Sequence, residues 1–134
     1  MPSQDSDIRP FLPVKERAIL IIEDHDGTRD ALATLLSNAF EGWALLTAGS
    51  AERGLEVFHA SSPAVVIMDA SLPGMDGFEG TRLIKARRPA TVVIMHSMHT
   101  DDVYRDRAVA AGASAFVSKI CAADDLVATI RRLL

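Results

Sequence analysis

The strongest constraint on the fold of this chain is a strict alternation between two kinds of segment. Short runs rich in apolar and β-branched residues recur five times, and a segment with helical periodicity follows each of them. Strands that alternate with helices form parallel sheets, because each helix carries the chain back before the next strand begins. The predicted strands are Ala18–Glu23, Trp43–Thr47, Ala64–Asp69, Thr91–Met95 and Ser114–Val117.

Two of these runs indicate that both faces of the sheet are covered. Ile19–Ile22 and Val65–Met68 are uninterrupted apolar runs, a pattern typical of strands buried on both sides. The intervening segments supply apolar helical stripes that can cover those faces, such as Leu126, Ile130 and Leu133. The predicted fold class is therefore α/β, with one parallel sheet of five strands and helices on both faces.

Capping residues support three of the predicted helices. Ser50 is a suitable N-cap for a helix over Ala51–Ala60. Asp76 precedes Glu79 by three residues, a spacing that resembles a capping box opening a helix over Phe78–Arg87. Gly112 is expected to end a helix that begins near Asp101.

Length and composition limit the class of protein. The 134 residues form one domain, with an irregular arm over residues 1–16 and the folded domain over residues 17–134. A net charge of −4 argues against binding nucleic acid through bulk charge. Cys121 is the single cysteine, which excludes an internal disulfide. We expect a cytoplasmic protein, because the chain has neither a signal-peptide h-region nor an apolar run long enough to span a membrane.

The polar residues that end the strands are the candidates for chemistry. In an open parallel sheet, ligands bind beyond the carboxyl ends of the strands. The first strand ends in Glu23 and Asp24, the third in Asp69, and the fourth is followed by Ser97. Lys119 follows the fifth. Three acids, a hydroxyl and a lysine are therefore expected in one crevice.

Three neighbouring carboxylates repel one another and need compensating positive charge. Oxygen ligands of this kind suit Mg²⁺, and Lys119 would add a fixed cation. A metal ion, a lysine, a hydroxyl and a carboxylate nucleophile are together the groups needed to transfer a phosphoryl group onto a carboxylate.

With these residues in view, the sequence resembles the CheY-like receiver domain of bacterial two-component response regulators. The resemblance covers about residues 17–134. It implies a flavodoxin-like, doubly wound sheet with strand order 2-1-3-4-5. The stretches that carry the resemblance are residues 21–24 (IIED), 65–77 (VVIMDASLPGMDG), 92–97 (VVIMHS) and 111–119 (AGASAFVSK).

The resemblance also implies a role for each site residue. Asp69 would be the phosphoacceptor, supplied by a sensor histidine kinase or a phosphotransfer protein. Mg²⁺ would be bound by Asp24 directly, by Glu23 through water, by Asp69 and by the backbone carbonyl of Ser71. The remaining roles are a switch hydroxyl, an aromatic switch and a phosphate-binding cation, filled by Ser97, Phe116 and Lys119.

As a receiver, the chain would not turn over a substrate, and would at most dephosphorylate itself. Phosphorylation would change the surface formed by the last two helices and the last strand. That change would alter binding to a downstream protein, produce a homodimer, or act on a covalently attached output domain. The chain would then be either a single-domain regulator or the receiver portion of a longer helix-turn-helix DNA-binding regulator.

The sequence departs from the usual receiver pattern in three respects. Ile120 replaces the proline that often follows the lysine, so the Lys119–Ile120 bond is expected to be trans. Met98 is larger than the usual residue after the switch hydroxyl, and would narrow the path to Asp69. His96 and His99 have no standard role in the family.

Other interpretations of the same residues stay open at this point. Glu23 and Asp24 would alternatively form an N-cap cluster for the first helix, although a cap needs one acid and not a pair, and Phe116 would alternatively be an ordinary core residue. A haloacid-dehalogenase-like phosphatase would need a second acid two residues after the nucleophile, where this chain has Ser71. A phosphorylation-independent interaction module is the third class of function to test.

Overall fold

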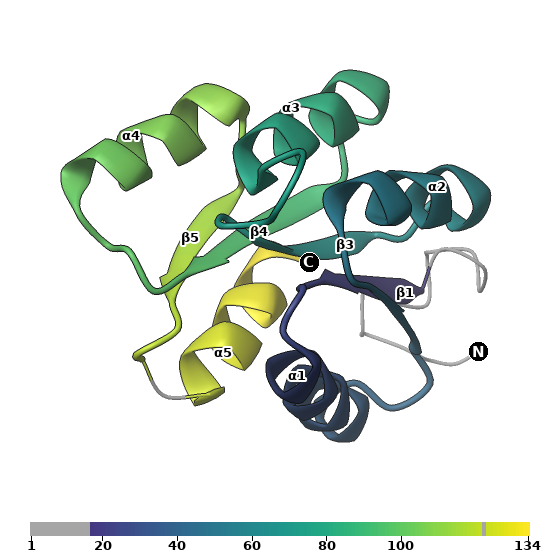
Figure 1. The fold of residues 1–134 in the computed structure, drawn as a ribbon. Coiled ribbons are helices and arrows are strands. Elements are labelled where there is room, and N and C mark those ends of the chain that lie inside the picture. Colours follow the sequence, from purple (N-terminus) through teal and green to yellow (C-terminus); the bar gives the residue numbers. More distant parts are fainter. Residues whose placement is uncertain (1–16, 122) are drawn as a thin grey trace.

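The computed structural model describes residues 17–121 and 123–134, and these residues form a parallel five-stranded sheet in the order β2-β1-β3-β4-β5 (Figure 1). The predicted fold class and strand order are therefore confirmed. The strands are β1 (Ala18–Ile22), β2 (Ala44–Ala48), β3 (Val65–Asp69), β4 (Val92–Ser97) and β5 (Ala115–Ser118). The helices are α1 (Asp26–Ala39), α2 (Ala51–Ser61), α3 (Gly77–Arg87), α4 (Asp102–Ala111) and α5 (Ala123–Leu133).

The helices cover both faces of the sheet, as the apolar strands require. Helices α2, α3 and α4 lie on one face, and α1 and α5 lie on the other (Figure 1). On the first face, Phe58 and Ile84 pack with alternate residues of the strands. On the second face, Leu36 and Ile130 do so. Every residue of β1 and β3 is buried, which confirms that these strands are covered on both sides.

The fourth strand continues further than its composition suggested. It includes His96 and Ser97, whereas the predicted strand stopped at Met95. The ladder continues because both neighbouring strands offer partners: Asp69 pairs with His96, and Ser97 pairs with Ser118. Tertiary pairing thus extends β4 over two polar residues and aligns its end with the ends of β3 and β5.

The predicted helix boundaries agree with the capping contacts. Ser50 Oγ accepts a hydrogen bond from the Arg53 backbone N–H over 3.1 Å. Asp76 Oδ1 accepts from the Glu79 N–H over 2.9 Å, and Gly112 ends α4 with a φ of 90°. The reciprocal half of the expected capping box is not seen, since the Glu79 carboxylate pairs instead with the guanidinium of Arg82.

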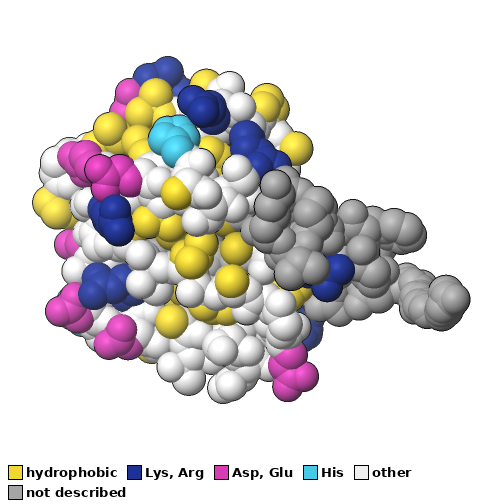
Figure 2. Space-filling model, turned by 90° about the vertical axis from the view of Figure 1, so that its right-hand side faces the viewer, with side chains coloured by type: hydrophobic (Ala, Val, Ile, Leu, Met, Phe, Trp, Pro, Cys, Tyr) yellow, Lys and Arg dark blue, Asp and Glu magenta, His cyan; other side chains and the backbone are white. Residues whose placement is uncertain are grey.

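The surface shown in Figure 2 is mixed in character. Hydrophobic side chains lie there among charged side chains of both signs. None of the helices in residues 17–121 and 123–134 has the length and apolar character needed to cross a bilayer. The predicted arm over residues 1–16 lies outside the described residues.

Candidate functional site

Three carboxylates meet where β1 and β3 end. Glu23, Asp24 and Asp69 each offer an oxygen, and these oxygens lie within 4.8 Å of one another. The residues are far apart in sequence but close in space, because β1 and β3 are neighbouring parallel strands. Glu23 is 2% exposed and Asp69 5%, while Asp24 is open to solvent. The predicted acidic cluster is therefore formed by this fold.

Lys119 supplies positive charge to this cluster from the end of β5. Its Nζ lies 2.7 Å from Glu23 Oε1 and 3.3 Å from Asp69 Oδ1. Burial alone would lower the pKa of Lys119, but the hydrogen bond to Glu23 and the negative charge of Asp69 raise it above its usual value. The lysine is therefore a permanent cation between the two buried acids.

The two buried acids differ in proton affinity. Burial and the neighbouring charge of Glu23 raise the pKa of Asp69 to about 6, against the opposing effects of Lys119 and the Ser71 N–H. Burial also acts on Glu23, but hydrogen bonds from Lys119 and from the His25 backbone N–H bring the pKa of Glu23 below its usual value. Asp69 is thus the acid that protonates first as the pH falls.

The segment after Asp69 holds that side chain in place. The Ser71 N–H donates to Asp69 Oδ1 over 3.1 Å, which brings the Ser71 backbone to the site. A Cβ on Gly77 would lie 2.0 Å from the backbone oxygen of Asp69, so the start of α3 can pack here only as glycine. The start of α3 therefore packs directly against the backbone of Asp69 and Ala70.

Ser97 lies at the end of β4, beside Ser118 and Lys119 at the end of β5. It is 1% exposed, and its Oγ accepts a hydrogen bond from the His99 N–H over 3.0 Å. The Lys119 N–H donates to the Ser97 carbonyl over 2.8 Å. The backbones of Ser97 and Lys119 are therefore joined directly, because β4 and β5 are paired strands.

His25 is a residue of this site that sequence reasoning missed. Its Nδ1 accepts from the Thr28 N–H over 3.2 Å and caps α1, so the alternative in which Glu23 and Asp24 cap this helix is wrong. The His25 N–H also donates to Glu23 Oε2 over 3.0 Å. Histidine is not among the preferred N-cap residues, so no sequence signal pointed to this role. With His25 as the cap, neither acid caps the helix, and the Asp24 side chain stays exposed to solvent.

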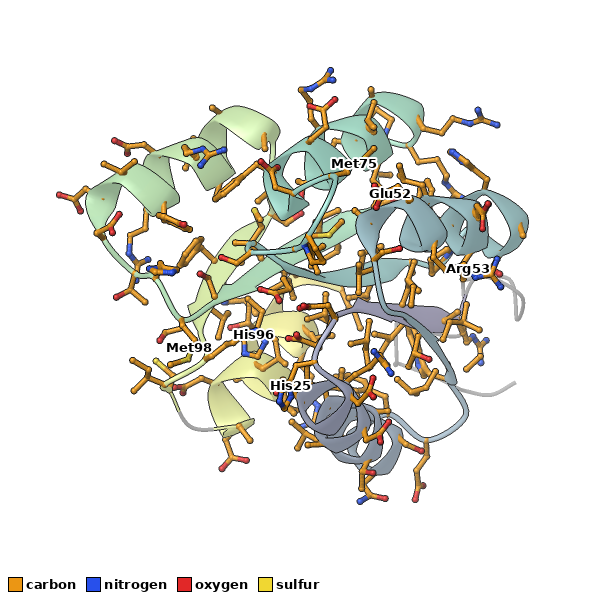
Figure 3. All side chains as sticks on the ribbon, viewed as in Figure 1. His25, Glu52, Arg53, Met75, His96 and Met98 are labelled. Carbon is orange, nitrogen blue, oxygen red and sulfur yellow. The ribbon has the colours of Figure 1, made fainter. Side chains whose placement is uncertain are left out.

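Two further histidines lie near the site: His96 belongs to the end of β4 (Figure 3), and His99 lies in the loop that follows this strand. His96 is 8% exposed, and its Nδ1 is buried without a hydrogen-bond partner among the described residues. Burial, together with the charge of Lys119, lowers the pKa of His96 to about 4, so it is neutral at physiological pH. The ring of His99 stacks on Tyr104, with centroids 4.7 Å apart.

The remaining predicted residues lie around the end of β5 and the β4–α4 loop. Phe116 is half-buried under the guanidinium of Arg105, 5.0 Å from its ring centroid. Met98 and Ile120 are exposed to 59% and 74%. The Lys119–Ile120 bond is trans as predicted, since the described chain contains no cis peptide bond.

The donor set fits a small divalent cation. All the side-chain donors of the cluster are carboxylate oxygens, the hard ligands that Mg²⁺ prefers, and Asp24 remains accessible to an ion and its waters. A dication would also relieve the repulsion that raises the pKa of Asp69. The residues present are therefore suited to Mg²⁺.

Comparison with known proteins gives the family. The model of the response regulator receiver domain matches residues 19–131. The transcriptional activator protein ExaE of Pseudomonas putida is 37% identical over 116 residues, which are 87% of this chain and 54% of ExaE. This chain thus spans about half the length of the curated relatives it matches.

Solved structures of response regulators and of a chemotaxis protein have the same fold as this chain. The signal receiver domain of a DNA-binding response regulator from Colwellia psychrerythraea is 31% identical, with a TM-score of 0.80 over 87% of this chain and 96% of that one. The chemotaxis protein CheY4 of Vibrio cholerae shares the fold, with a TM-score of 0.81 at 24% identity over 87% of this chain and 98% of that one. The acidic cluster at the ends of β1 and β3, the lysine of β5 and these matches together lead to one conclusion: the chain belongs to the receiver domains of two-component response regulators.

Proposed function

We propose that this receiver domain is a phosphoacceptor switch in which Asp69 takes a phosphoryl group from a phosphohistidine. The donor would be a sensor histidine kinase or a phosphotransfer protein of a cytoplasmic phosphorelay. One observation carries the proposal: buried Asp69 shares a cluster with two further acids and lies 3.3 Å from the ammonium group of Lys119. A buried structural acid would need only one partner, whereas phosphoryl transfer needs all of these groups.

Phosphoryl transfer to Asp69 would form one bond to phosphorus and break another. An oxygen of ionised Asp69 attacks phosphorus, a P–O bond forms, and the P–N bond to the donor histidine breaks. The imidazole nitrogen leaves with the bonding electron pair and takes up a proton. The ammonium of Lys119, already beside Asp69, stabilises the negative charge on the phosphoryl oxygens.

Glu23, Asp24, Asp69 and the backbone carbonyl of Ser71 are the residues we propose for holding Mg²⁺. When bound, the ion neutralises charge on the phosphoryl oxygens. The chain's own contribution is to keep the carboxylates in place. Lys119 and the His25 N–H hold Glu23, and the Ser71 N–H holds Asp69.

The new phosphoryl group carries a charge of about −2, which would attract the Ser97 hydroxyl and Lys119. Ser97 Oγ would then exchange its bond from the His99 N–H for one to the phosphoryl group. Because His99 stacks on Tyr104 of α4, movement there would reach α4 and β5, with Phe116 as the aromatic switch. The altered α4–β5–α5 surface would bind a downstream protein or a second copy of the chain.

A second candidate places this domain in a longer regulator. ExaE is described as a transcriptional activator, and the matched region is about half of its length. We therefore propose a helix-turn-helix DNA-binding output domain as the alternative to a separate protein partner. In either case the receiver itself would not contact DNA or a membrane, and would not be an enzyme acting on further substrates.

The test is intact mass measured after incubation with acetyl phosphate or a cognate kinase and Mg²⁺. We expect the mass of one added phosphoryl group on the wild type, none on Asp69→Asn, and a reduced rate for Asp24→Asn. Asp30→Asn is the matched control, because Asp30 is an exposed acid of α1 outside the acidic cluster, and it should label like the wild type. Equal labelling of Asp69→Asn and wild type would refute the proposal.

Two further measurements separate the other classes of function. Partner binding that survives Asp69→Ala unchanged would favour a phosphorylation-independent interaction module. Sustained turnover of a phosphomonoester would favour a phosphatase, although Ser71 stands where such an enzyme needs its general acid.

A further inference from the structure

The loop between β3 and α3, residues 70–76, carries the backbone of Ser71 and is held at both ends. At its start, the Ser71 N–H donates to Asp69 Oδ1 over 3.1 Å. At its end, the Gly77 N–H donates to the Ala70 carbonyl over 3.1 Å, which closes the loop at its base. Leu72 is buried beneath it, while Ser71, Pro73 and Gly74 are exposed. The outer part of this loop therefore needs a further contact to be fixed.

Glu52 of α2 provides such a contact. Its Oε2 accepts a hydrogen bond from the Met75 backbone N–H over 3.1 Å, across 23 residues of sequence (Figure 3). Ser50 caps α2 two residues earlier, so the backbone of Glu52 is held in the first helical turn. Its own N–H and the Met75 N–H lower the pKa of Glu52, which keeps the carboxylate ionised at physiological pH. A charged acceptor makes a stronger hydrogen bond than a neutral one.

Gly74 makes room for this contact. Its φ of +74° lies in the left-handed region, which favours glycine. A Cβ at this position would also lie 2.8 Å from Glu52 Oε2. The carboxylate thus fits against a glycine whose backbone turns the loop toward it.

We propose that Glu52 is a positioning residue for the phosphoacceptor site, which acts by fixing the loop that presents the Ser71 carbonyl to Mg²⁺. The inference rests on the proposed function and deepens it. Glu52 is not among the residues proposed to hold Mg²⁺ or the phosphoryl group, and its influence passes through the Met75 backbone to the residues between Ser71 and Met75. Residues that orient metal ligands in this way commonly change metal affinity when they are replaced.

The test compares three variants of the complete chain. Glu52→Ala removes the acceptor, and Glu52→Gln keeps a carbonyl oxygen that can still accept from the Met75 N–H. Glu56→Ala is the matched control, because Glu56 lies one turn further along α2 and pairs only with the exposed Arg53 in the described contacts. Mg²⁺ affinity is measured by calorimetric titration without any phosphodonor, and amide hydrogen exchange reports on the Met75 N–H.

We expect Glu52→Ala to weaken Mg²⁺ binding by roughly threefold to tenfold, below the usual range for groups that bond a metal ligand directly. Exchange of the Met75 amide should accelerate by about tenfold. Glu52→Gln should restore most of the affinity, and Glu56→Ala should match the wild type. Phosphorylation of Glu52→Ala should be slow at low Mg²⁺ and approach the wild-type rate at saturating Mg²⁺.

Three results would overturn the proposal. Unchanged Mg²⁺ affinity in Glu52→Ala with faster Met75 exchange would make the contact merely structural. An equal loss in Glu56→Ala would point to general weakening of α2, and an equal loss in Glu52→Gln would point to charge alone. Failure of the proposed function is distinguishable, because it would appear as a wild-type chain that binds Mg²⁺ without accepting a phosphoryl group.

Discussion

Lys119 Nζ lies 2.7 Å from Glu23 Oε1, although the two residues are 96 positions apart in sequence. The lysine is closer to Glu23 than to Asp69, from which it is separated by 3.3 Å. In this structure the ammonium group of Lys119 therefore pairs most closely with Glu23. A phosphoryl group on Asp69 would compete with Glu23 for that cation, which couples the state of the phosphoacceptor to the position of the Lys119 side chain.

Replacing the lysine should destabilise the domain in a pH-dependent way. In Lys119→Met, Glu23 and Asp69 are buried without their cation, and we expect a loss of about 3 kcal/mol near pH 8 without Mg²⁺. The loss of folding stability should be smaller at about pH 5, because protonated Asp69 no longer repels Glu23. Urea unfolding at both pH values measures this. The same loss at both would show that packing, and not charge, dominates.

Removing the phosphoacceptor charge should have the opposite effect on stability. The pKa of Asp69 is raised to about 6, so its ionised form opposes folding above that pH. We expect Asp69→Asn to gain about 2 kcal/mol near pH 8 without Mg²⁺. Saturating Mg²⁺ should raise the Tm of the wild type and leave the Tm of the variant nearly unchanged. Melting curves with and without the ion provide the measurement, and a variant less stable than the wild type would contradict it.

The two perturbed groups should give opposite pH dependences. His96 has a folded-state pKa of about 4, below its usual 6.5, so between these values the unfolded chain binds more protons and stability rises with pH. Asp69 has a raised pKa, so between its usual 3.8 and about 6 the folded chain binds more protons and stability falls with pH. The two contributions largely cancel in the wild type.

Single substitutions should expose each contribution. We expect His96→Leu to gain about 2 kcal/mol near pH 5 relative to its effect near pH 8. The gain arises because leucine removes the cost of keeping a buried imidazole neutral at a pH where the unfolded chain would protonate it. Asp69→Asn should instead gain stability near pH 8 relative to its effect near pH 5. Free energies of unfolding across this range measure both slopes. Parallel profiles for the two variants would mean that these groups do not titrate as described.

Gly77 should be intolerant of any side chain. A Cβ would lie 2.0 Å from the Asp69 carbonyl oxygen, which is backbone and cannot move aside without displacing the β3–α3 loop. We expect Gly77→Ala to cost about 3 kcal/mol or more. Gly27→Ala is the control, since its Cβ would meet only the side chain of His25, 3.3 Å away, and helix propensity favours alanine. Chemical denaturation compares them, and equal effects would argue against the close approach.

Much of the architecture could be predicted because it depends on local patterns. The apolar runs of β1 and β3 predicted a sheet covered on both faces, and Ser50, Asp76 and Gly112 marked helix ends that the structure shows. The meeting of Glu23, Asp24, Asp69 and Lys119 could also be predicted, because the ends of parallel strands lie along one edge of a sheet. The roles assigned to these residues in phosphoryl transfer remain predictions.

Other features depended on contacts that no local pattern encodes. His25 caps α1 against ordinary preference, and Ser97 belongs to β4 only because Ser118 pairs with it. Glu52 holds the β3–α3 loop from a different helix. By itself, then, the sequence determined the order and type of the elements and the edge where polar residues gather, since these follow from periodicity and chain connectivity. The tertiary structure alone decided the proton affinities, the end of β4 and the anchor of the β3–α3 loop, because these depend on burial and on distances between residues remote in the chain.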